Sequence, residues 1–398
     1  MKDRTILHCD LNNFFASVSL LEHKDLVNKP VAVCGSTEER HGIVLAKNEI
    51  AKKFGVKTAE VTWQAKLKCP GLIVLPPEYE KYEKYSRAAR SIYERYTDMI
   101  EPFGIDECWL DVTGSWLLFG SGEEIAYRIK ESVKSELGCT ISVGVSFNNV
   151  FAKLGSDIKK PDAVTVIDKE NFMGKIGGLP LGDLLFAGPK TVAKLQSYGI
   201  MTIKDITLCN DEMLKRVLGI NGIVLKNYAL GLDSSPVTPI SRDYMPKSVG
   251  RSVTPSTDIT DRETVFRIFI ELAESVCREL RGKGLAATGV TVHTRTCYLE
   301  TKESSRSLRN GTNCSITLAE KAMELFDEVY NFNLPLRSVG LRAINLKPKD
   351  GIARQFDLFG NGLRDEKNDL IEDSIINIRE RFGNKYIKRC RNIEALKP

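Results

Sequence analysis

The segment Phe103-Gly-Ile-Asp-Glu-Cys-Trp-Leu-Asp111 places two adjacent carboxylates, Asp106 and Glu107, inside an apolar run. The apolar neighbours favour β-strands and Gly104 favours a bend, so the segment predicts a strand–turn–strand with the acids at the turn. Adjacent carboxylates repel each other, and apolar surroundings raise the cost of ionising both. A divalent cation relieves this repulsion, and oxygen-only ligands suit Mg²⁺ or Mn²⁺. The alternative is an exposed acidic turn without a ligand.

A third carboxylate, Asp10, ends a predicted buried strand at residues 5–11, which is followed by a helix from residue 13 to about 22. The carboxyl ends of strands form the edge at which α/β folds tend to place ligands. The alternative interpretation of Asp10 is a helix cap, but Asn12 can serve as that cap and leave Asp10 free. A distant third acid strengthens the prediction of a metal site.

The composition excludes several classes of protein. The 398 residues are 42% hydrophobic and 27% charged, which is typical of globular proteins, and the net charge of +5 is only a weak bias towards polyanions. The ten cysteines are scattered without a CxxC pair, which favours reduced thiols over zinc or disulfides. No apolar run approaches the roughly 18 residues of a membrane span, and the first residues do not resemble a signal peptide. We therefore expect a cytoplasmic protein without membrane segments.

Residues 1–168 predict an α/β unit with a mixed sheet, because apolar strands alternate with amphipathic helices. One of these helices is expected at residues 79–100, directly before the acidic turn. Residues of about 24–77 look like a smaller insertion with a lysine-rich helix at 47–57. Lysines around a helix start suit a triphosphate cradle, although a solvated surface helix shows the same pattern.

From about residue 168 the sequence changes to short helices broken by glycine. Residues 187–200 fit a helix–hairpin–helix, in which backbone N–H groups at a glycine turn grip a DNA phosphate without reading sequence. Residues 218–222 resemble a second, degenerate copy. A generic glycine-bearing helical turn is the alternative. Residues 233–239, rich in proline and serine, predict a linker.

Residues 247–346 predict the βαββαβ order of a ferredoxin-like domain. Between residues 241 and 349, seventeen Lys and Arg accompany thirteen Asp and Glu. Several of these basic residues fall in predicted strands, where they would follow a phosphate backbone: Arg251, Arg295, Arg306 and Arg309. The alternative is a sheet face that is merely soluble.

The tail from residue 353 to 398 is polar apart from Gln355-Phe-Asp-Leu-Phe359, and a charged amphipathic helix is expected to follow to about residue 382. A glutamine with large apolar residues on a polar tail indicates a peptide that docks in a partner's groove.

Four segments in fixed order resemble the Y-family (translesion) DNA polymerases, in particular the DNA polymerase IV and ImpB/MucB/SamB-type branches. These segments are Asp10-Leu-Asn-Asn-Phe-Phe-Ala16, Ile105-Asp-Glu-Cys-Trp-Leu-Asp111, Phe151-Ala-Lys through Lys160-Pro161, and Lys247-Ser-Val-Gly250. The resemblance covers effectively the whole chain. It implies a template-directed DNA polymerase that extends primers past damaged bases in a DNA-repair or SOS-type response.

The resemblance also implies roles for individual residues. Asp10, Asp106 and Glu107 would hold two Mg²⁺ ions, for which Mn²⁺ may substitute, with help from the backbone carbonyl of Leu11. Phe15 matches the aromatic steric gate that collides with a ribose 2′-hydroxyl, whereas Phe14 matches a core position. The remaining implied contacts are Lys47, Lys52 and Lys160 to the triphosphate, Gly188 and Lys190 to DNA, and Gln355, Leu358 and Phe359 to the sliding clamp.

The implied fold is a multidomain α+β right hand with an α/β palm, small fingers, a helical helix–hairpin–helix thumb and a βαββαβ little finger. The expected boundaries are palm 1–23 and 78–168, fingers 24–77, thumb 169–234, linker 235–241, little finger 242–350 and tail 351–398. The expected partners are primer–template DNA, dNTPs and the replicative sliding clamp, and we expect a monomer. A clamp would raise the effective concentration of the enzyme at the primer end.

The chain departs from the family pattern at three places. Asn12 stands where a second Asp is common. In the fingers, Ala46, Glu49 and Lys52 replace the usual Thr, Tyr and Arg, so Glu49 is expected to turn away from the triphosphate and Lys52 lacks the bidentate fork of arginine. Phe186 replaces the first glycine of the helix–hairpin–helix.

Two other functions are compatible with parts of the pattern. A nucleotide cyclase also pairs two metals with carboxylates, but it would not need the thumb, the little finger or a clamp peptide. A catalytically silent homologue that binds DNA or the clamp is favoured only by Glu49, and the three retained acids argue against it.

Overall fold

The computed structural model describes residues 4–38, 40, 42–239, 245–351, 361–383 and 386–387. The chain divides into two compact units, which are considered separately. The N-terminal unit comprises residues 1–37 and 42–243, and the C-terminal unit comprises residues 244–398 with 38–41. None of the described helices is long and apolar enough to cross a membrane.

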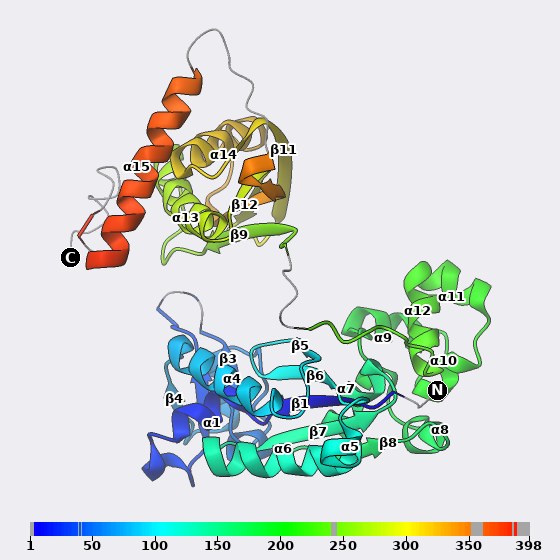
Figure 1. The fold of residues 1–398 in the computed structure, drawn as a ribbon. Helices are drawn as coiled ribbons and strands as arrows, with labels where there is room; N and C mark the ends of the chain where they lie inside the picture. Colours follow the sequence, from blue (N-terminus) through cyan, green and yellow to red (C-terminus); the bar gives the residue numbers. More distant parts are fainter. Residues whose placement is uncertain are drawn as a thin grey trace. The chain divides into compact units, whose positions relative to one another are not determined.

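The N-terminal unit is built on a five-stranded sheet in the order β5-β6-β1-β7-β8 (Figure 1). The strands are β1 (Ile6–Leu11), β5 (Ile100–Pro102), β6 (Glu107–Asp111), β7 (Ile141–Ser146) and β8 (Val164–Ile167). Only β7 and β8 pair in parallel, so the sheet is mixed, as predicted. The whole of β1 is buried in its centre.

Helices cover both faces of this sheet. On one face, Leu7, Cys9 and Leu11 of β1 share a core with α4 (Tyr79–Tyr93) and α6 (Gly122–Leu137). On the other face lies α7 (Asn149–Ile158). A Cβ at Gly144 of β7 would lie 1.9 Å from the Ala152 carbonyl oxygen, so glycine permits the close approach of α7. The short helices α1 (Phe14–Leu20) and α5 (Trp116–Phe119) contribute to the core on the same face as α4 and α6.

The helix expected at residues 79–100 was too long, because α4 ends at Tyr93. The following residues make a turn in which the Thr97 hydroxyl donates to the Asp111 carbonyl at 2.7 Å and accepts from the Met99 N–H at 3.1 Å. These bonds favour an extended segment at Ile100, which begins β5 opposite β6. A threonine that bonds to the backbone thus outweighs the helical pattern of the apolar residues.

The insertion at residues 24–77 forms a separate small sheet in the order β3-β2-β4. Its elements are η1 (Lys24–Leu26), β2 (Val31–Cys34), β3 (Val44–Lys47), α2 (Glu49–Lys53), α3 (Thr62–Lys68) and β4 (Ile73–Leu75). The Asn48 side chain caps α2 by accepting from Ala51 N–H at 3.0 Å and also accepts from Val31 N–H at 3.1 Å. One buried side chain thereby joins the helix start to the sheet.

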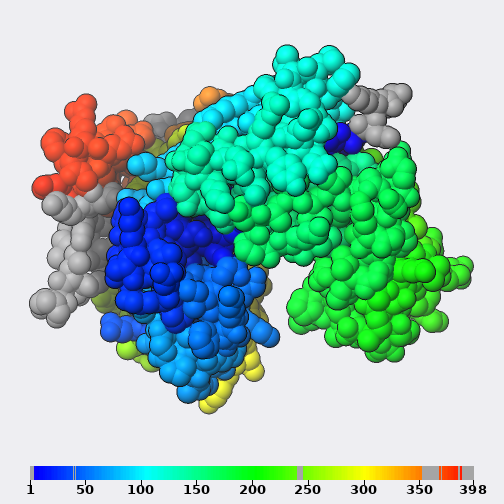
Figure 2. Space-filling model, turned by 90° about the horizontal axis from the view of Figure 1, so that it is seen from below, coloured from blue at the N-terminus to red at the C-terminus, as the bar shows by residue number. Residues whose placement is uncertain are grey.

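A helical segment follows β8 and packs on Phe151 and Leu154 of α7. Its elements are α8 (Phe172–Ile176), η2 (Leu181–Asp183), α9 (Pro189–Gln196), α10 (Ile203–Thr207), α11 (Asp211–Leu218) and α12 (Ile220–Ala229). Figure 2 shows the N-terminal unit hollowed between this green segment and the blue segment of the small sheet.

The C-terminal unit has the predicted βαββαβ order, with antiparallel strands arranged β11-β10-β12-β9. Its elements are β9 (Ser248–Val253), α13 (Arg262–Gly282), β10 (Leu285–Thr296), β11 (Thr301–Thr312), α14 (Ser315–Val329), β12 (Leu336–Pro348), η3 (Lys349–Gly351) and α15 (Asn361–Phe382). Both α13 and α14 pack on one face of the sheet through a common core. Helix α15 contributes the buried Glu372, which accepts from Ser315 N–H at 3.0 Å at the start of α14.

Candidate active site

Strands β1 and β6 bring together two acids that are distant in the sequence. In their antiparallel register Asp10 lies opposite Glu107, and the Leu11 N–H donates to the Asp106 carbonyl at 3.1 Å. Because side chains alternate along a strand, Asp10 and His8 point to the same face of the sheet. The predicted meeting of the acids at one sheet edge therefore has a direct structural basis in the pairing of β1 with β6.

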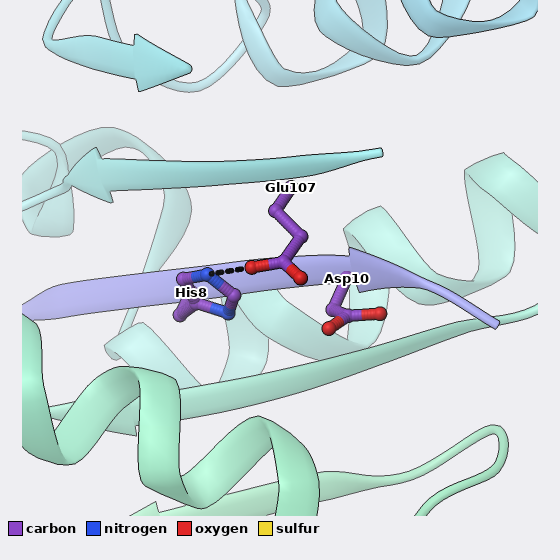
Figure 3. Close-up of side chains that lie close together, drawn as sticks. All are labelled: His8, Asp10 and Glu107. Atoms are coloured by element: carbon purple, nitrogen blue, oxygen red, sulfur yellow. Dashed lines mark ion pairs between the residues drawn. The ribbon is translucent and has the colours of Figure 1, made fainter. Parts of the chain in front are cut away.

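Figure 3 shows the side chains of His8, Asp10 and Glu107 lying together. One potential ligand atom from each of these residues lies within 4.8 Å of the other two. His8 is fully buried, and its Nε2 lies 3.3 Å from Glu107 Oε2. Sequence reasoning missed His8, because a histidine two residues before Asp10 in a buried strand looks the same in the sequence as a core histidine.

Asp106 lies in the turn just before β6, outside this cluster of three. Burial raises the pKa of its carboxyl to about 6, with further contributions from the charges of Asp10 and Glu107. Its carboxylate is therefore close enough to interact with both other acids. An ionised Asp106 in this place favours a bound cation, because a cation offsets both the burial and the repulsion.

Two lysines of α7 and the loop after it neutralise the acids. Lys153 Nζ lies 3.1 Å from Asp10 Oδ2 and 3.0 Å from Glu107 Oε2. Lys160 Nζ lies 2.5 Å from Asp10 Oδ2 and 2.7 Å from Asp157 Oδ1. Burial alone would lower the pKa of both lysines, but the surrounding carboxylates raise it above the ordinary value. Lys160 was a predicted site residue, whereas Lys153 was not.

Glu107 favours its ionised form, whereas His8 favours its neutral form. Burial alone would raise the pKa of Glu107, but contacts with His8 and Lys153 outweigh it and lower this pKa to about 2. Burial lowers the pKa of His8, which favours a neutral imidazole. The contact is therefore one between a carboxylate and a neutral ring.

The residues present fit a site for divalent cations. Asp10 and Glu107 lie together where β1 ends and β6 begins, with Asp106 in the adjoining turn. The ammonium group of Lys153 lies against both paired acids, and that of Lys160 lies against Asp10. Glu107 Oε2 is buried without a hydrogen bond of good geometry to any described residue. Oxygen donors of this kind suit Mg²⁺ and Mn²⁺.

The two phenylalanines of α1 differ in burial. Phe14 is 3% exposed and belongs to the core, whereas Phe15 is half-buried. The Phe15 ring stacks on Tyr82 with centroids 4.2 Å apart and meets the edge of Tyr79 at 5.9 Å. Tyrosines of α4 thus hold the ring that the family resemblance implies as the steric gate.

Strand β3 and helix α2 supply two of the three lysines predicted for the triphosphate, Lys47 and Lys52. Lys47 Nζ donates to Thr58 Oγ1 at 2.8 Å, and burial together with the charge of Lys52 lowers the pKa of Lys47. Glu49 accepts from Asn13 Nδ2 at 2.9 Å and lies 3.7 Å from Lys52 Nζ. Glu49 is therefore held between the start of α1 and the lysine whose charge it offsets.

Asn12 is a structural residue in this fold. It is 4% exposed, its Nδ2 donates to Ser142 Oγ at 2.9 Å, and its Oδ1 accepts from Asp162 N–H at 2.8 Å. These bonds tie the end of β1 to β7 and to the loop after α7. The amide thus has both a donor and an acceptor role, which a carboxylate at this position would not provide.

The predicted helix–hairpin–helix begins at Gly188, which caps α9, and Lys190 follows it as an exposed residue. Phe186 has φ of 66° and is 68% exposed. It therefore adopts the left-handed conformation that a glycine takes without strain.

The four arginines predicted along the second sheet lie on different sides of it. Arg251 NH2 lies 2.8 Å from Glu279 of α13, and Arg306 pairs with Glu328 of α14, so both point towards the helices. Arg295 lies two residues from His293 on the opposite, open face. Arg309 is exposed on β11.

The open face also carries residues that the charge count did not single out. Arg342 lies opposite Thr291 on this face and is 3.4 Å from Glu303. A hollow of about 300 Å³ is lined there by Gly250, His293, Gly340 and Arg342, among others. The predicted clamp residues Gln355, Leu358 and Phe359 lie outside the described residues.

Comparisons with known proteins agree with the fold and with the motifs. The family model described as "impB/mucB/samB family" matches residues 9–157, and that described as "impB/mucB/samB family C-terminal domain" matches residues 246–358. A Y-family DNA polymerase chimera of known structure aligns with a TM-score of 0.77 at 24% identity, covering 86% of this chain and 98% of the chimera. This likeness confirms the predicted multidomain α+β fold.

Curated relatives match almost end to end. DNA polymerase IV of Acetivibrio thermocellus is 47% identical over 386 residues, which are 97% of this chain and 96% of that protein. DNA polymerase IV 1 of Bacillus subtilis is 37% identical over 388 residues, which are 98% and 93% of the two proteins. Matched in both of its units and along nearly the full length of these relatives, the chain belongs to the impB/mucB/samB family of Y-family DNA polymerases.

Proposed function

We propose that this chain is a template-directed DNA polymerase of the translesion type, which adds deoxynucleotides to a primer 3′-end and bypasses damaged bases in DNA repair. The observation that carries the proposal is the pairing of Asp10 with Glu107 across β1 and β6, with Asp106 in the adjoining turn. The relatives that match nearly end to end are named DNA polymerase IV. The fold and the named relatives favour this activity over that of a nucleotide cyclase.

Asp10, Asp106 and Glu107 would hold two Mg²⁺ ions, or Mn²⁺ in their place, with the Leu11 carbonyl as a further ligand. Such ions, when bound, activate the primer 3′-hydroxyl and neutralise charge on the triphosphate and the leaving pyrophosphate. The carboxylates accept the ions without a proton transfer of their own. Lys153, held by Asp10 and Glu107, limits the repulsion between the acids before the ions arrive.

Phe15 is the proposed steric gate against ribonucleotides. Its ring is clamped against Tyr82 and Tyr79, so it cannot rotate away from a ribose 2′-hydroxyl without breaking two aromatic contacts. The clamped aromatic ring would therefore select deoxynucleotides by collision.

Lys47, Lys52 and Lys160 are the proposed contacts to the triphosphate. The pKa of Lys47 is influenced by the charges of both Lys52 and Lys160, which indicates that the three ammonium groups face a common region. Glu49 offsets part of the charge of Lys52. Lys160 is likewise paired with Asp10 and Asp157, so we propose that the three lysines share the contacts to the triphosphate.

For DNA, the proposed contacts are Gly188 and Lys190 at the start of α9, and Arg295 and Arg309 in the C-terminal sheet. Arg251 and Arg306 remain weaker candidates, because each is paired with an acid of a helix. The peptide Gln355–Phe359 is proposed to bind a sliding clamp on the strength of its sequence alone. We further propose that the enzyme acts as a monomer in the cytoplasm.

Single-nucleotide incorporation on a primed template tests the proposal. With Mg²⁺, we expect incorporation of the matching dNTP and not of the rNTP, gain of rNTP incorporation in Phe15→Ala, and loss of product in Asp106→Ala. Extension that survives Asp106→Ala would refute the metal assignment. A wild-type protein that binds the primer–template but adds no nucleotide would instead indicate a silent homologue, and Glu49→Tyr would be the first reversion to try.

A further inference from the structure

His8 is a buried imidazole that lies between a proposed metal ligand and helix α7. It is 0% exposed, and its Nδ1 lies 3.0 Å from the hydroxyl oxygen of Ser156, itself 1% exposed. Its Nε2 lies 3.3 Å from Glu107 Oε2 (Figure 3), although this contact does not have the geometry of a hydrogen bond. The Trp109 ring meets the edge of the His8 ring at a centroid distance of 5.4 Å. The ring is thus fixed on three sides, while the proposed chemistry of the three acids gives it no role.

The surroundings of the ring determine which nitrogen carries the proton. A lone pair on Nε2 would face the carboxylate of Glu107, which is repulsive, whereas an Nε2–H can donate to it. Nδ1 is then an acceptor for the Ser156 hydroxyl. That hydroxyl also lies 2.7 Å from the Lys153 carbonyl, but this carbonyl has a partner within α7 and does not depend on Ser156.

We propose that His8 is a positioning residue, which accepts from Ser156 at Nδ1 and directs an Nε2–H towards Glu107 Oε2, and so orients that carboxylate for a metal ion. The inference rests on the proposed role of Glu107 as a ligand. Both His8 and Lys153 lie against Oε2 of Glu107, so the two side chains together limit the orientations of this carboxylate. A partner in this outer position typically changes metal affinity by about 10- to 100-fold.

The sheet itself places the ring. His8 lies opposite Gly144 in the register of β1 with β7, and Gly144 is the point at which α7 comes closest to the sheet. A Cβ at Gly144 would lie 2.5 Å from the backbone nitrogen of Ser156. The same close approach that admits α7 therefore brings the Ser156 hydroxyl to the His8 ring, and His8 couples α7 to the acid of β6.

Two substitutions separate the two ends of the ring. In His8→Gln the side-chain amide reaches the position of Nε2 and can still donate to Glu107. In His8→Asn it reaches only the position of Nδ1 and keeps the contact to Ser156 alone. Cys9→Ala is the matched control, because Cys9 is equally buried in β1 but belongs to the core on the opposite face.

The measurement is Mn²⁺ affinity, from the EPR signal of free Mn²⁺, in the full-length protein with a dideoxy-terminated primer–template and dNTP, so that no turnover occurs. We expect His8→Asn to weaken one of the bound ions about tenfold, and His8→Gln and Cys9→Ala to stay within about twofold of the wild type. In incorporation assays, His8→Asn should raise the Mg²⁺ concentration for half-maximal rate and leave half-saturation by dNTP unchanged.

Three results would overturn the inference. Equal Mn²⁺ affinity in the wild type and His8→Asn would show that the contact does not position Glu107. Equal loss in His8→Asn and His8→Gln would show that the ring only fills space. A nitrogen coupling from a directly bound imidazole in the pulsed EPR spectrum of the wild type would make His8 a ligand. If Glu107→Gln leaves Mn²⁺ affinity unchanged, the proposed metal role of Glu107 itself fails.

Discussion

The two larger sheets of this protein carry their charged residues in opposite ways. In the N-terminal unit, helices cover both faces of the sheet, Asp10 is 4% exposed, and Lys153 pairs with both Asp10 and Glu107. In the C-terminal unit, helices α13 and α14 cover one face, and Arg295 and Arg342 lie on the other. A buried charge must find a partner, whereas an exposed one need not. Short sequence motifs therefore predict the buried, paired charges of the N-terminal sheet better than the exposed arginines of the C-terminal sheet.

The largest effect is expected for Asp10→Asn. Loss of this carboxylate should lower the rate of nucleotide incorporation by at least about 10³-fold, because several kcal/mol of charge stabilisation are lost. It also leaves Lys153 and Lys160, which are 14% and 27% exposed, without their shared partner, so the free energy of unfolding should fall by about 1–3 kcal/mol.

The matched change in the other sheet is Arg251→Ala, which removes an exposed ion pair with Glu279. It should change the free energy of unfolding by less than about 1 kcal/mol. Denaturant unfolding of the full chain and single-turnover incorporation measure both effects. A similar loss of stability in Arg251→Ala and Asp10→Asn would contradict the distinction between buried and exposed charge.

Gly144→Ala should give the next largest effect, because its Cβ would lie 1.9 Å from the Ala152 carbonyl oxygen and backbone atoms cannot turn aside. Helix α7 must then shift, which should reduce stability by about 1–3 kcal/mol. Since Lys153 and Ser156 move with the helix, the incorporation rate should fall by about 10²-fold.

Gly340→Ala in the C-terminal sheet is the control for this change. Its Cβ would lie 3.0 Å from the Ser252 Cβ and 3.2 Å from the Arg251 carbonyl oxygen, which is a milder overlap. We expect a smaller loss of stability and a normal rate of chemistry. Unchanged incorporation by Gly144→Ala would show that the distance of α7 from the sheet is not critical.

Much of the N-terminal site could be predicted because its chemistry is written in short segments. Asp106 and Glu107 stand together in an apolar run, and Asp10 ends a strand, so their meeting follows from strand pairing. His8 and Lys153 were missed for a different reason. Each acquires its role from a contact across β1, β6 and α7, and neither its residue type nor its spacing distinguishes it from a core histidine or a surface lysine.

The C-terminal sheet shows where sequence reasoning reached its limit. The order of strands and helices was predicted, and so were four arginines in strands. The face on which each arginine lies depends on the register, which no local pattern specified. Arg251 lies opposite Leu341 of the core and Arg306 opposite Val290, and both guanidinium groups pair with acids of the helices, whereas Arg295 lies on the open face.

A smaller effect concerns the pH dependence of the metal-free protein. Burial and the neighbouring acids raise the pKa of Asp106 from 3.8 to about 6, so the folded state holds this proton more tightly than the unfolded state. The resulting stability is present below about pH 4 and is lost as the pH rises through 6. Between pH 5 and 7 in EDTA, the wild type should lose about 1 kcal/mol relative to Asp106→Asn.

Urea unfolding of both proteins across this pH range measures the difference. Mg²⁺ should remove the loss of stability in the wild type, because a bound cation favours the ionised carboxyl of Asp106. It should have less effect on Asp106→Asn, which lacks this carboxyl. A difference that stays constant from pH 5 to 7 would mean that Asp106 does not titrate against the other acids of the site.

The smallest effect tests the open face of the C-terminal sheet directly. If Arg295 contacts a DNA phosphate, Arg295→Ala should weaken primer–template binding several-fold and reduce the slope of log K against log salt by about 1. Arg251→Ala and Arg306→Ala serve as controls of equal charge change, since Glu279 and Glu328 already hold these side chains. We expect their slopes to stay within about 0.3 of the wild type, because no phosphate contact is lost.

Fluorescence anisotropy of a labelled primer–template at several salt concentrations gives the slopes. Equal slopes in Arg295→Ala and the wild type would remove Arg295 from the proposed interface, and a reduced slope in Arg251→Ala would mean that DNA displaces Glu279 from its arginine. An ion pair that is present without DNA would then not exclude its arginine from DNA binding. The comparison of the two sheets would have to include ion pairs that break when DNA binds.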